Sequence, residues 1–322
     1  MRRALVLACL VAWPHTAAAD DNDIVLARLS TRLDDGTFVA QNLELRALSS
    51  QLGVVLAPHL LTPADTLGFG GFELAFDYAT TTIDSSASYW RVRQGAPDPS
   101  GTGGGVEAPG LLRTTGMFIR KGMWFPLPSF EIGAGAVHLN DSRIWAGQLY
   151  AKFGLHEGYH DLPIPSLSVR GGVSRMFNQR ELDLTIASLD IEVSKHFGIG
   201  GTWRLDPFAG WNLLMIVPRA EVVDATPDID PLDPAHAADT MSNFVFKNQA
   251  NIYRNRFFAG AKAQYYWFYI TVEVELALAG SSVDDRSGTN DACMPNSMTT
   301  NCDAKDIARS QRTISLSAGF DL

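Results

Sequence analysis

The sequence predicts an all-β protein: a transmembrane antiparallel β-barrel of about ten strands, with twelve as the alternative. Three observations predict this fold class. The chain begins with an export signal, stretches of alternating apolar and polar residues recur along it, and its longest connections follow odd-numbered strands. Membrane barrels turn apolar side chains to lipid and polar side chains to the lumen, so their strands have a sequence period of two.

The N-terminus has the three parts of a secretory signal peptide. Met1-Arg2-Arg3 is basic, residues 4–13 are apolar, and Ala17-Ala18-Ala19 offers a small-residue cleavage site. We expect residues 1–19 to be the signal and Asp20 to begin the exported chain. The apolar run is too short to cross a bilayer as a helix.

Residues 20–67 lack the alternating pattern and form a separate N-terminal segment. Residues 36–52 fit a short helix with a rough apolar stripe, and Pro58 and Pro63 follow it. Because this segment precedes the first predicted strand, we expect it either in the periplasm, against the mouth of the barrel, or inside the lumen as a plug.

The predicted barrel domain spans residues 68–322. Its last strand alternates most clearly, with Ile314, Leu316 and Phe320 on one face. Nine further segments share the pattern more or less strongly: 72–78, 111–120, 130–136, 145–153, 167–174, 182–194, 205–216, 254–265 and 270–278. In one of them the apolar phase slips between Ile186 and Leu189, which predicts a β-bulge near Ala187-Ser188.

The lengths of the connections predict which side of the membrane each one faces. The long connections 79–110, 218–250 and 280–311 all follow odd-numbered strands, and the even-numbered connections 122–129, 154–165, 196–203 and 266–268 are shorter. Bacterial barrels have short periplasmic turns and long outer loops. With both ends of the barrel in the periplasm, the three long loops therefore face the cell surface.

The polar faces of the strands predict a lumen that carries charges of both signs. The expected lumen-lining residues are Glu73, Asp77, Glu131, Lys152, Arg170, Asp190, Glu192, Arg254, Arg256, Lys262, Glu273 and Glu275. We expect Lys262 to pair with Glu273 or Glu275 across the tight turn near Trp267. Aromatic residues at short turns predict an interfacial girdle, made of Trp124, Tyr265, Tyr266, Trp267 and Tyr269.

The strand number restricts the function. Barrels of about eight strands are filled by side chains, whereas those of about sixteen hold open channels. We therefore expect a narrow porin or transporter-like barrel for small solutes. The alternatives are a structural or adhesive barrel that uses the loops 79–110, 218–250 and 280–311, and a rim enzyme, either a protease or a lipase. A continuous lumen favours the first, and a lumen blocked by paired charges favours the second.

One motif resembles a zinc-protease site. Residues 156–160 read His-Glu-Gly-Tyr-His, and the H-E-x-x-H chemistry needs both imidazoles on one helical face. Gly158 and the prolines that follow disfavour a helix here. We interpret the motif as a chance match and expect no catalytic residues, no metal site and no cofactor. His236 lies among aspartates in a long loop, which is the sole trace of a rim protease.

Charge and cysteine content exclude one class of partner and predict one covalent link. The net charge of −9 becomes −11 once Arg2 and Arg3 leave with the signal, which argues against a nucleic-acid partner. Cys293 and Cys302 lie close together in a polar stretch. In an oxidising compartment we expect them to form a disulfide in an outer loop.

Together, the signal, the strand pattern and the ending Ser317-Ala318-Gly319-Phe320-Asp321-Leu322 resemble Gram-negative outer-membrane β-barrel proteins from about Gly68 onward. Residues 193–195, 207–210, 258–260 and 314–320 are similar to uncharacterised barrels of the porin superfamily. The resemblance implies location in the cell outer membrane. It also implies outer-membrane lipids, the barrel-assembly machinery and small solutes as partners.

Overall fold

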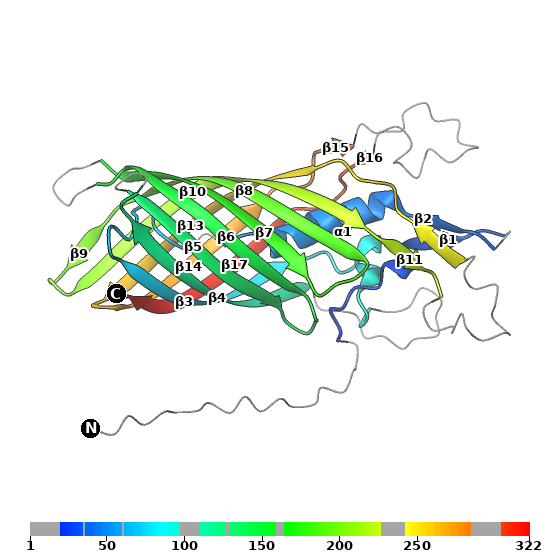
Figure 1. The fold of residues 1–322 in the computed structure, drawn as a ribbon, viewed down its shortest axis with the longest axis horizontal. Coiled ribbons are helices and arrows are strands. Elements are labelled where there is room, and N and C mark those ends of the chain that lie inside the picture. Colours follow the sequence, from blue (N-terminus) through cyan, green and yellow to red (C-terminus); the bar gives the residue numbers. More distant parts are fainter. Residues whose placement is uncertain are drawn as a thin grey trace, which may run out of the picture.

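A computed structural model describes residues 20–34, 36–59, 61–96, 110–125, 129–158, 164–226, 242–284 and 304–322. Ten long antiparallel strands close into a barrel, which confirms the predicted fold class (Figure 1). They are β3 (Phe72–Thr82), β4 (Leu111–Met123), β5 (Phe130–Leu139), β6 (Trp145–His156), β7 (Ser166–Phe177), β8 (Leu182–Ser194), β10 (Trp203–Ala220), β13 (Ile252–Tyr265), β14 (Phe268–Ala277) and β17 (Gln311–Asp321). Each pairs with the next, and β17 pairs with β3 to close the ring.

The alternating sequence produces a wall with two different faces. On β14, Ile270, Val272 and Leu276 are 43%, 49% and 46% exposed, whereas Thr271 and Glu273 between them are fully buried. The other strands repeat this pattern, so an apolar belt surrounds a polar interior. Soluble proteins do not expose a continuous apolar surface of this extent. No helix within the described ranges is long and apolar enough to cross a membrane.

The two ends of the barrel differ. The short connections and the C-terminus lie at one end, which we call the turn end and which is on the left in Figure 1. Phe72 begins the first barrel strand there, and its amide donates to the carbonyl of Leu322 at 2.9 Å. The long connections lie at the other end, the loop end. It also carries the short elements η2 (Ser88–Val92), β11 (Val222–Asp224), β12 (Asn243–Val245), β15 (Val283–Asp284) and β16 (Ala304–Lys305), while β9 (Phe197–Ile199) extends the turn end.

Residues 20–41 form a small cap at the loop end. The cap contains η1 (Leu26–Leu29) and a hairpin of β1 (Ser30–Arg32) with β2 (Phe38–Ala40). Its backbone bonds to several barrel connections: Asn22 to Asp141 at 2.8 Å, and Val25 to Val92 at 2.9 Å. The amide of Leu26 also donates to Glu181 at 2.8 Å. The N-terminal cap therefore lies at the end of the barrel opposite to the C-terminus.

After the cap the chain turns into the lumen. Helix α1 (Asn42–Val55) begins later and ends later than the predicted helix 36–52, because residues 38–40 pair with β1 instead. Residues 56–67, of which residue 60 lies outside the described ranges, then lead to the turn end, and we call them the lumen segment. Thr66 reaches Glu157 in a turn-end connection. Of the two placements left open by the sequence, the chain takes the one inside the barrel.

The predicted β-bulge near Ala187-Ser188 is wrong. Strand β8 pairs without interruption with both β7 and β10, and its inward positions stay in one phase from Leu182 to Ser194. The inward residues change from apolar (Leu184, Ile186) to polar (Ser188) because the apolar ones contact α1 inside the lumen. A register shift does occur between Gly154 and His156, where β6 meets β7.

Candidate functional site: a filled lumen

The half of the lumen nearer to the loop end is an apolar core around α1. Leu45, Leu48 and Leu52 of the helix are at most 1% exposed, and they belong to one cluster with inward residues of the wall such as Leu214 and Ile216. The helix approaches β10 closely at Gly53. A Cβ atom added there would lie 2.6–2.9 Å from three side-chain atoms of Ile216, so any side chain at this position would force Ile216 to move.

Polar contacts fix α1 to the loops. Arg46 donates to the carbonyl of Ala250 at 2.9 Å, and Ser50 donates to the carboxylate of Asp306 at 2.5 Å. The indole of Trp90 donates to the side-chain oxygen of Gln51 at 2.6 Å. Burial raises the pKa of the Asp306 carboxyl above its ordinary value, and the hydrogen bond from Ser50 opposes that rise. The helix is thus tied to three different connections.

The lumen segment is held by side chains from most of the circumference of the barrel. Gln148 and Ser174 donate to the carbonyl of Leu56 at 3.1 and 2.7 Å. Lys152 donates to two carbonyls of the segment at 3.0 Å each. The guanidinium group of Arg256 donates to the carbonyl of Pro58 at 3.0 Å. In the other direction, backbone amides of the segment donate to side chains of the wall, each at 3.0 Å: Leu61 to Glu273, Ala64 to Ser194 and Leu67 to Glu131. An irregular backbone inside a membrane needs such partners, because unpaired peptide groups are costly there.

All twelve predicted lumen-lining residues are at most 6% exposed and lie inside the barrel. Most of them form ion pairs. The pairs are Glu131–Lys152 at 3.4 Å, Arg170–Asp190 at 2.7 Å, Arg256–Glu275 at 3.0 Å and Lys262–Glu73 at 2.8 Å. Arg254 instead donates to Ser50 of α1 at 2.8 Å. Most of the charges therefore neutralise one another or hold the N-terminal segment, whereas the carboxylates of Asp77 and Glu192 have no hydrogen-bond partner among the described residues.

The predicted pairing of Lys262 with Glu273 or Glu275 is wrong. Tyr265 pairs with Phe268 around a two-residue turn, so Lys262 lies opposite Thr271, one position away from the predicted register. The ammonium group of Lys262 points across the barrel to Glu73, and also to Asp321 at 3.3 Å. The partners come from the strand that begins the barrel and the strand that ends it.

The aromatic girdle is wrong at one position. Trp124, Tyr265, Tyr266 and Trp267 are 64%, 42%, 64% and 57% exposed near the turn end, but Tyr269 is fully buried. Its hydroxyl donates to Glu73 at 2.9 Å, and the ammonium of Lys262 lies 4.1 Å from its ring centroid. Tyr269 therefore belongs to the lumen and supports the Glu73–Lys262 pair.

Several lumen residues were not predicted. Arg120 forms an ion pair with Glu73, Asn212 bonds to Asp190, and Asp206 binds both His196 and Arg204 at 2.6 Å. The alternation places Arg120, Asn212 and Asp206 on the inward face, so the strand phase could have identified them, whereas His196 lies in the connection between two strands. His59 has no such signal, since it lies in the lumen segment and is 6% exposed.

The structure describes the other candidate sites only in part. His156 is the last residue of β6 and Glu157 follows it outside any helix, so the described part of the H-E-x-x-H motif lacks the helical geometry of a zinc protease. Within the described ranges no group of three or more histidine, cysteine or acidic residues could hold a metal ion. His160, His236 and the predicted Cys293–Cys302 disulfide lie outside the described residues.

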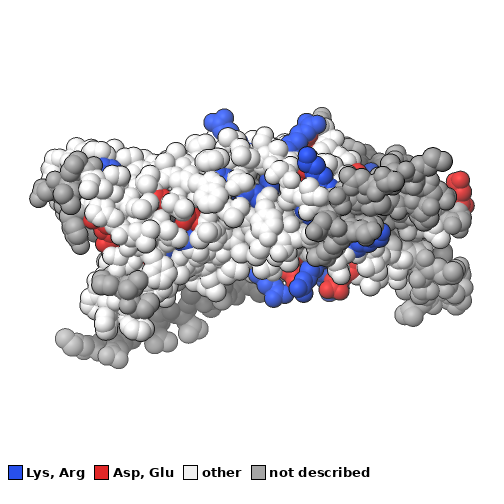
Figure 2. Space-filling model, turned by 90° about the horizontal axis from the view of Figure 1, so that it is seen from above, with Lys and Arg blue, Asp and Glu red and all other residues white. Residues whose placement is uncertain are grey.

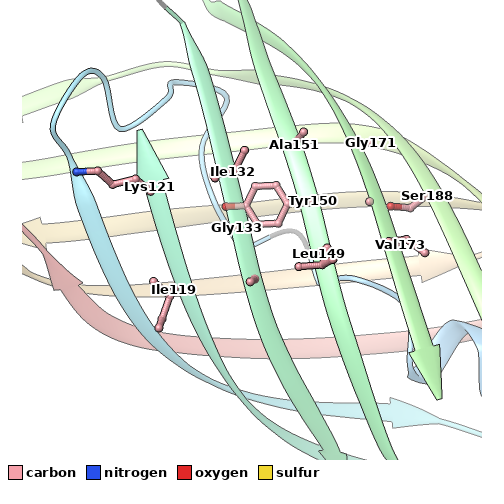
Figure 3. A pocket seen from close by; sticks show the side chains of 12 residues that line it. Ile119, Lys121, Ile132, Gly133, Leu149, Tyr150, Ala151, Gly171, Val173 and Ser188 are labelled. Atoms are coloured by element: carbon pink, nitrogen blue, oxygen red, sulfur yellow. The ribbon is translucent and has the colours of Figure 1, made fainter. Parts of the chain in front are cut away.

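Several hollows accompany the filled lumen in the described part of the chain. One of about 700 Å³ lies against the wall across β5, β6 and β7, lined by apolar residues such as Leu149 and Val173 and by Gly171 (Figure 3). A polar cavity of about 200 Å³ lies at the turn end and is lined by Glu73, Lys262 and part of the lumen segment. The first is a lipid-facing surface, and the second is a polar cavity bounded on one side by the lumen segment.

The closed ring, its apolar belt and its charged interior together determine the class. The chain is an outer-membrane β-barrel. Its location in the outer membrane follows, because closed strands with an apolar exterior are the β-structure that can span lipid.

We compared the chain with known proteins. No protein-family model matches the chain, and no curated protein matches it. Among solved structures, the outer-membrane protease OmpT of Escherichia coli is similar at 10% identity and a TM-score of 0.29, over 80% of this chain and 98% of that one. Ail, the attachment invasion locus protein of Yersinia pestis, aligns at 8% identity and a TM-score of 0.26, over 79% and 99%.

An outer-membrane protein OmpT of Vibrio cholerae aligns at 7% identity and a TM-score of 0.27, over 66% of this chain. The aligned region spans 57% of that protein, so the match covers a little over half of its length. TM-scores this low carry no functional inference. The class of the protein therefore rests on the barrel itself.

Proposed function

We propose that this protein is a sealed barrel that acts at the cell surface as a structural or adhesive protein, and that it does not serve as an open porin. The N-terminal cap and the long loops lie at the same end of the barrel, which is the outer end by the rule for loop lengths. In this arrangement the wall anchors the cap and the loops in the membrane.

The observation that carries the proposal is the path of the lumen segment. Its backbone bonds to side chains of β5, β6, β7, β8, β13 and β14, which are six of the ten barrel strands, and these bonds support a segment that blocks the bore. Leu56, Ala57, Leu61 and Ala64 of the segment are all fully buried. Opening a solute path requires many of these bonds to break together.

Single-channel recording in a planar bilayer tests the proposal. The full chain is compared with a variant that lacks residues 20–67 and begins at Gly68. We expect the full chain to be electrically silent and the shortened barrel to conduct, because its lumen then contains charged side chains and water. Folding of both barrels is checked by their heat-dependent shift in gel mobility.

A second variant covers the case in which the shortened chain does not fold. Lys152→Met and Arg256→Met together remove three hydrogen bonds to the lumen segment. We expect brief openings from this variant and none from Arg175→Met, which alters an outward-facing arginine. Steady conductance from the unaltered chain would refute the seal and favour the narrow porin.

A further inference from the structure

The outward-facing positions of the ten barrel strands carry charge at few places, and most of these are arginines near the loop end. They are Arg113, Arg175, Arg219 and Arg312, together with Asp183, while Lys121 lies toward the turn end. Each arginine lies within three residues of the loop-end terminus of its strand. In Figure 2, blue side chains project from the half of the barrel nearer to the loop end. Positive charge therefore gathers at the outer border of the membrane.

Two of these arginines flank one strand. Arg113 lies opposite Thr80 on β3, and the backbone amide of Arg312 donates to the hydroxyl oxygen of Thr82 at 2.9 Å. From strand spacing and rise, their Cα atoms lie roughly 12 Å apart on the same face. Long arginine side chains span this gap, so both guanidinium groups can reach one ligand between them. Neither forms an ion pair with a described carboxylate.

A third arginine adds to this face. Arg309 is 74% exposed and binds Asp84 at 2.7 Å, directly above the end of β3. The three arginines and one aspartate leave a net positive charge on the β17–β3–β4 face. On the β7–β8–β10 face, by contrast, Asp183 lies between Arg175 and Arg219 and binds Arg175 at 2.9 Å. The β17–β3–β4 face is therefore the better site for an anion.

The wall below these arginines is apolar. Tyr78, Met117, Ile314 and Leu316 point outward there and are 40%, 49%, 46% and 47% exposed. A ligand that fits this surface needs an anionic head at the membrane border and hydrocarbon chains below it. Free phosphate or a soluble anion would use the arginines and leave the apolar surface to other lipids.

We propose that Arg113, Arg312 and Arg309 bind the phosphate groups of a phosphorylated glycolipid of the outer leaflet, whose acyl chains lie along β17, β3 and β4. The planar guanidinium group offers two parallel donors and matches a phosphate group in geometry and charge. The site lies on the outer wall, so the proposal does not depend on whether the lumen conducts.

Native mass spectrometry of the full barrel in detergent tests the proposal, with purified bis-phosphorylated lipid A as the probe and its dephosphorylated form as the comparison. We expect the unaltered protein to bind the phosphorylated probe at least tenfold more tightly. Arg113→Ala with Arg312→Ala should abolish that preference. Arg113→Lys with Arg312→Lys should keep part of it, because charge remains while the paired donors are lost.

Arg175→Ala is the matched control, since it removes an arginine at the same height that already binds Asp183. We expect it to retain the preference. Equal binding of both probes by the unaltered protein would overturn the proposal, as would full binding by the double alanine variant. Competition by millimolar inorganic phosphate alone would show a headgroup site for any phosphate and would also overturn the assignment to a lipid.

Discussion

Gly53 gives the sharpest test of how α1 fits into the barrel. A methyl group at this position meets three atoms of the Ile216 side chain at 2.6–2.9 Å. Two of them are bonded directly to the Cβ atom of Ile216, so a change of rotamer cannot clear all three contacts. Overpacking of this kind costs about 1–3 kcal/mol. Replacing glycine by alanine inside a helix returns about 0.5–1 kcal/mol.

The two effects predict that Gly53→Ala weakens the docking of α1 by about 1 kcal/mol, because the overpacking cost exceeds the gain in helix propensity. Hydrogen exchange of the α1 amides, followed by mass spectrometry in detergent, measures this change as exchange several times faster. Ile216→Ala alone should also speed exchange, because it leaves a cavity against the helix.

The combination of both substitutions tests whether the added methyl group contacts Ile216. With Ile216→Ala in place, Gly53→Ala has room for its methyl group and should slow exchange, so its effect changes sign. Ser49→Ala is the control on the same helix, since the Ser49 hydroxyl has no hydrogen-bond partner within the described ranges. If Gly53→Ala slows exchange in the unaltered background as well, α1 does not pack on β10 at this point.

Three further predictions follow from the described contacts. Lys262→Met should lower the unfolding temperature, since one-sided loss of a buried pair costs about 3–5 kcal/mol. Combined with Glu73→Gln it should cost less than the sum of the two single effects, whereas combined with Glu273→Gln the two effects should add. A protease site placed at Asp20 should be cleaved on intact cells, because the N-terminal cap lies at the outer end; protection until the membrane is broken would contradict this. Burial raises the pKa of Asp306 above its ordinary 3.8. The docking of α1 is therefore most stable below pH 3.8 and weakens as the pH rises through the raised pKa; hydrogen exchange of the α1 amides should show this pH dependence in the unaltered protein and not in Asp306→Asn.

The architecture of the wall was readable from the sequence because strand alternation is a local property. A residue such as Ile270 faces lipid and its neighbour Thr271 faces the lumen, whatever the lumen contains. The parity of the connections then predicted that the long connections share one end of the barrel. Both signals depend on near neighbours in the chain, and neither needs knowledge of long-range contacts.

The contents of the lumen were harder to predict, because they depend on contacts between distant parts of the chain. The phase change between Ile186 and Leu189 predicts a bulge, but in the structure it marks the depth at which α1 ends inside the barrel. An inward face that is apolar near one end and polar near the other indicates an apolar element in the bore. That interpretation requires the N-terminal segment to be considered together with the strands.

Small errors at one turn had large consequences for the predicted site. A shift of one position around Tyr266-Trp267 places Lys262 opposite Thr271 and away from Glu273. Its long side chain then reaches across the lumen to Glu73, which becomes its partner. The aromatic neighbours of Tyr269 predict that it belongs to the girdle, although its position in the alternation points it inward. For side chains in this barrel the phase of the strand was more informative than residue type.

The route of the N-terminal segment constrains the order of assembly. The segment enters at the loop end and leaves at the turn end, where Phe72 immediately begins the wall. A ring that had already closed would have to admit the cap hairpin through a bore filled by its own side chains. The last pairing to form is therefore expected to be that of β3 with β17, which joins the two strands farthest apart in sequence and is entropically slow. Until β3 and β17 pair, the sheet can wrap around the N-terminal segment from the side. The segment would then be enclosed as the barrel forms and would not have to be inserted afterwards.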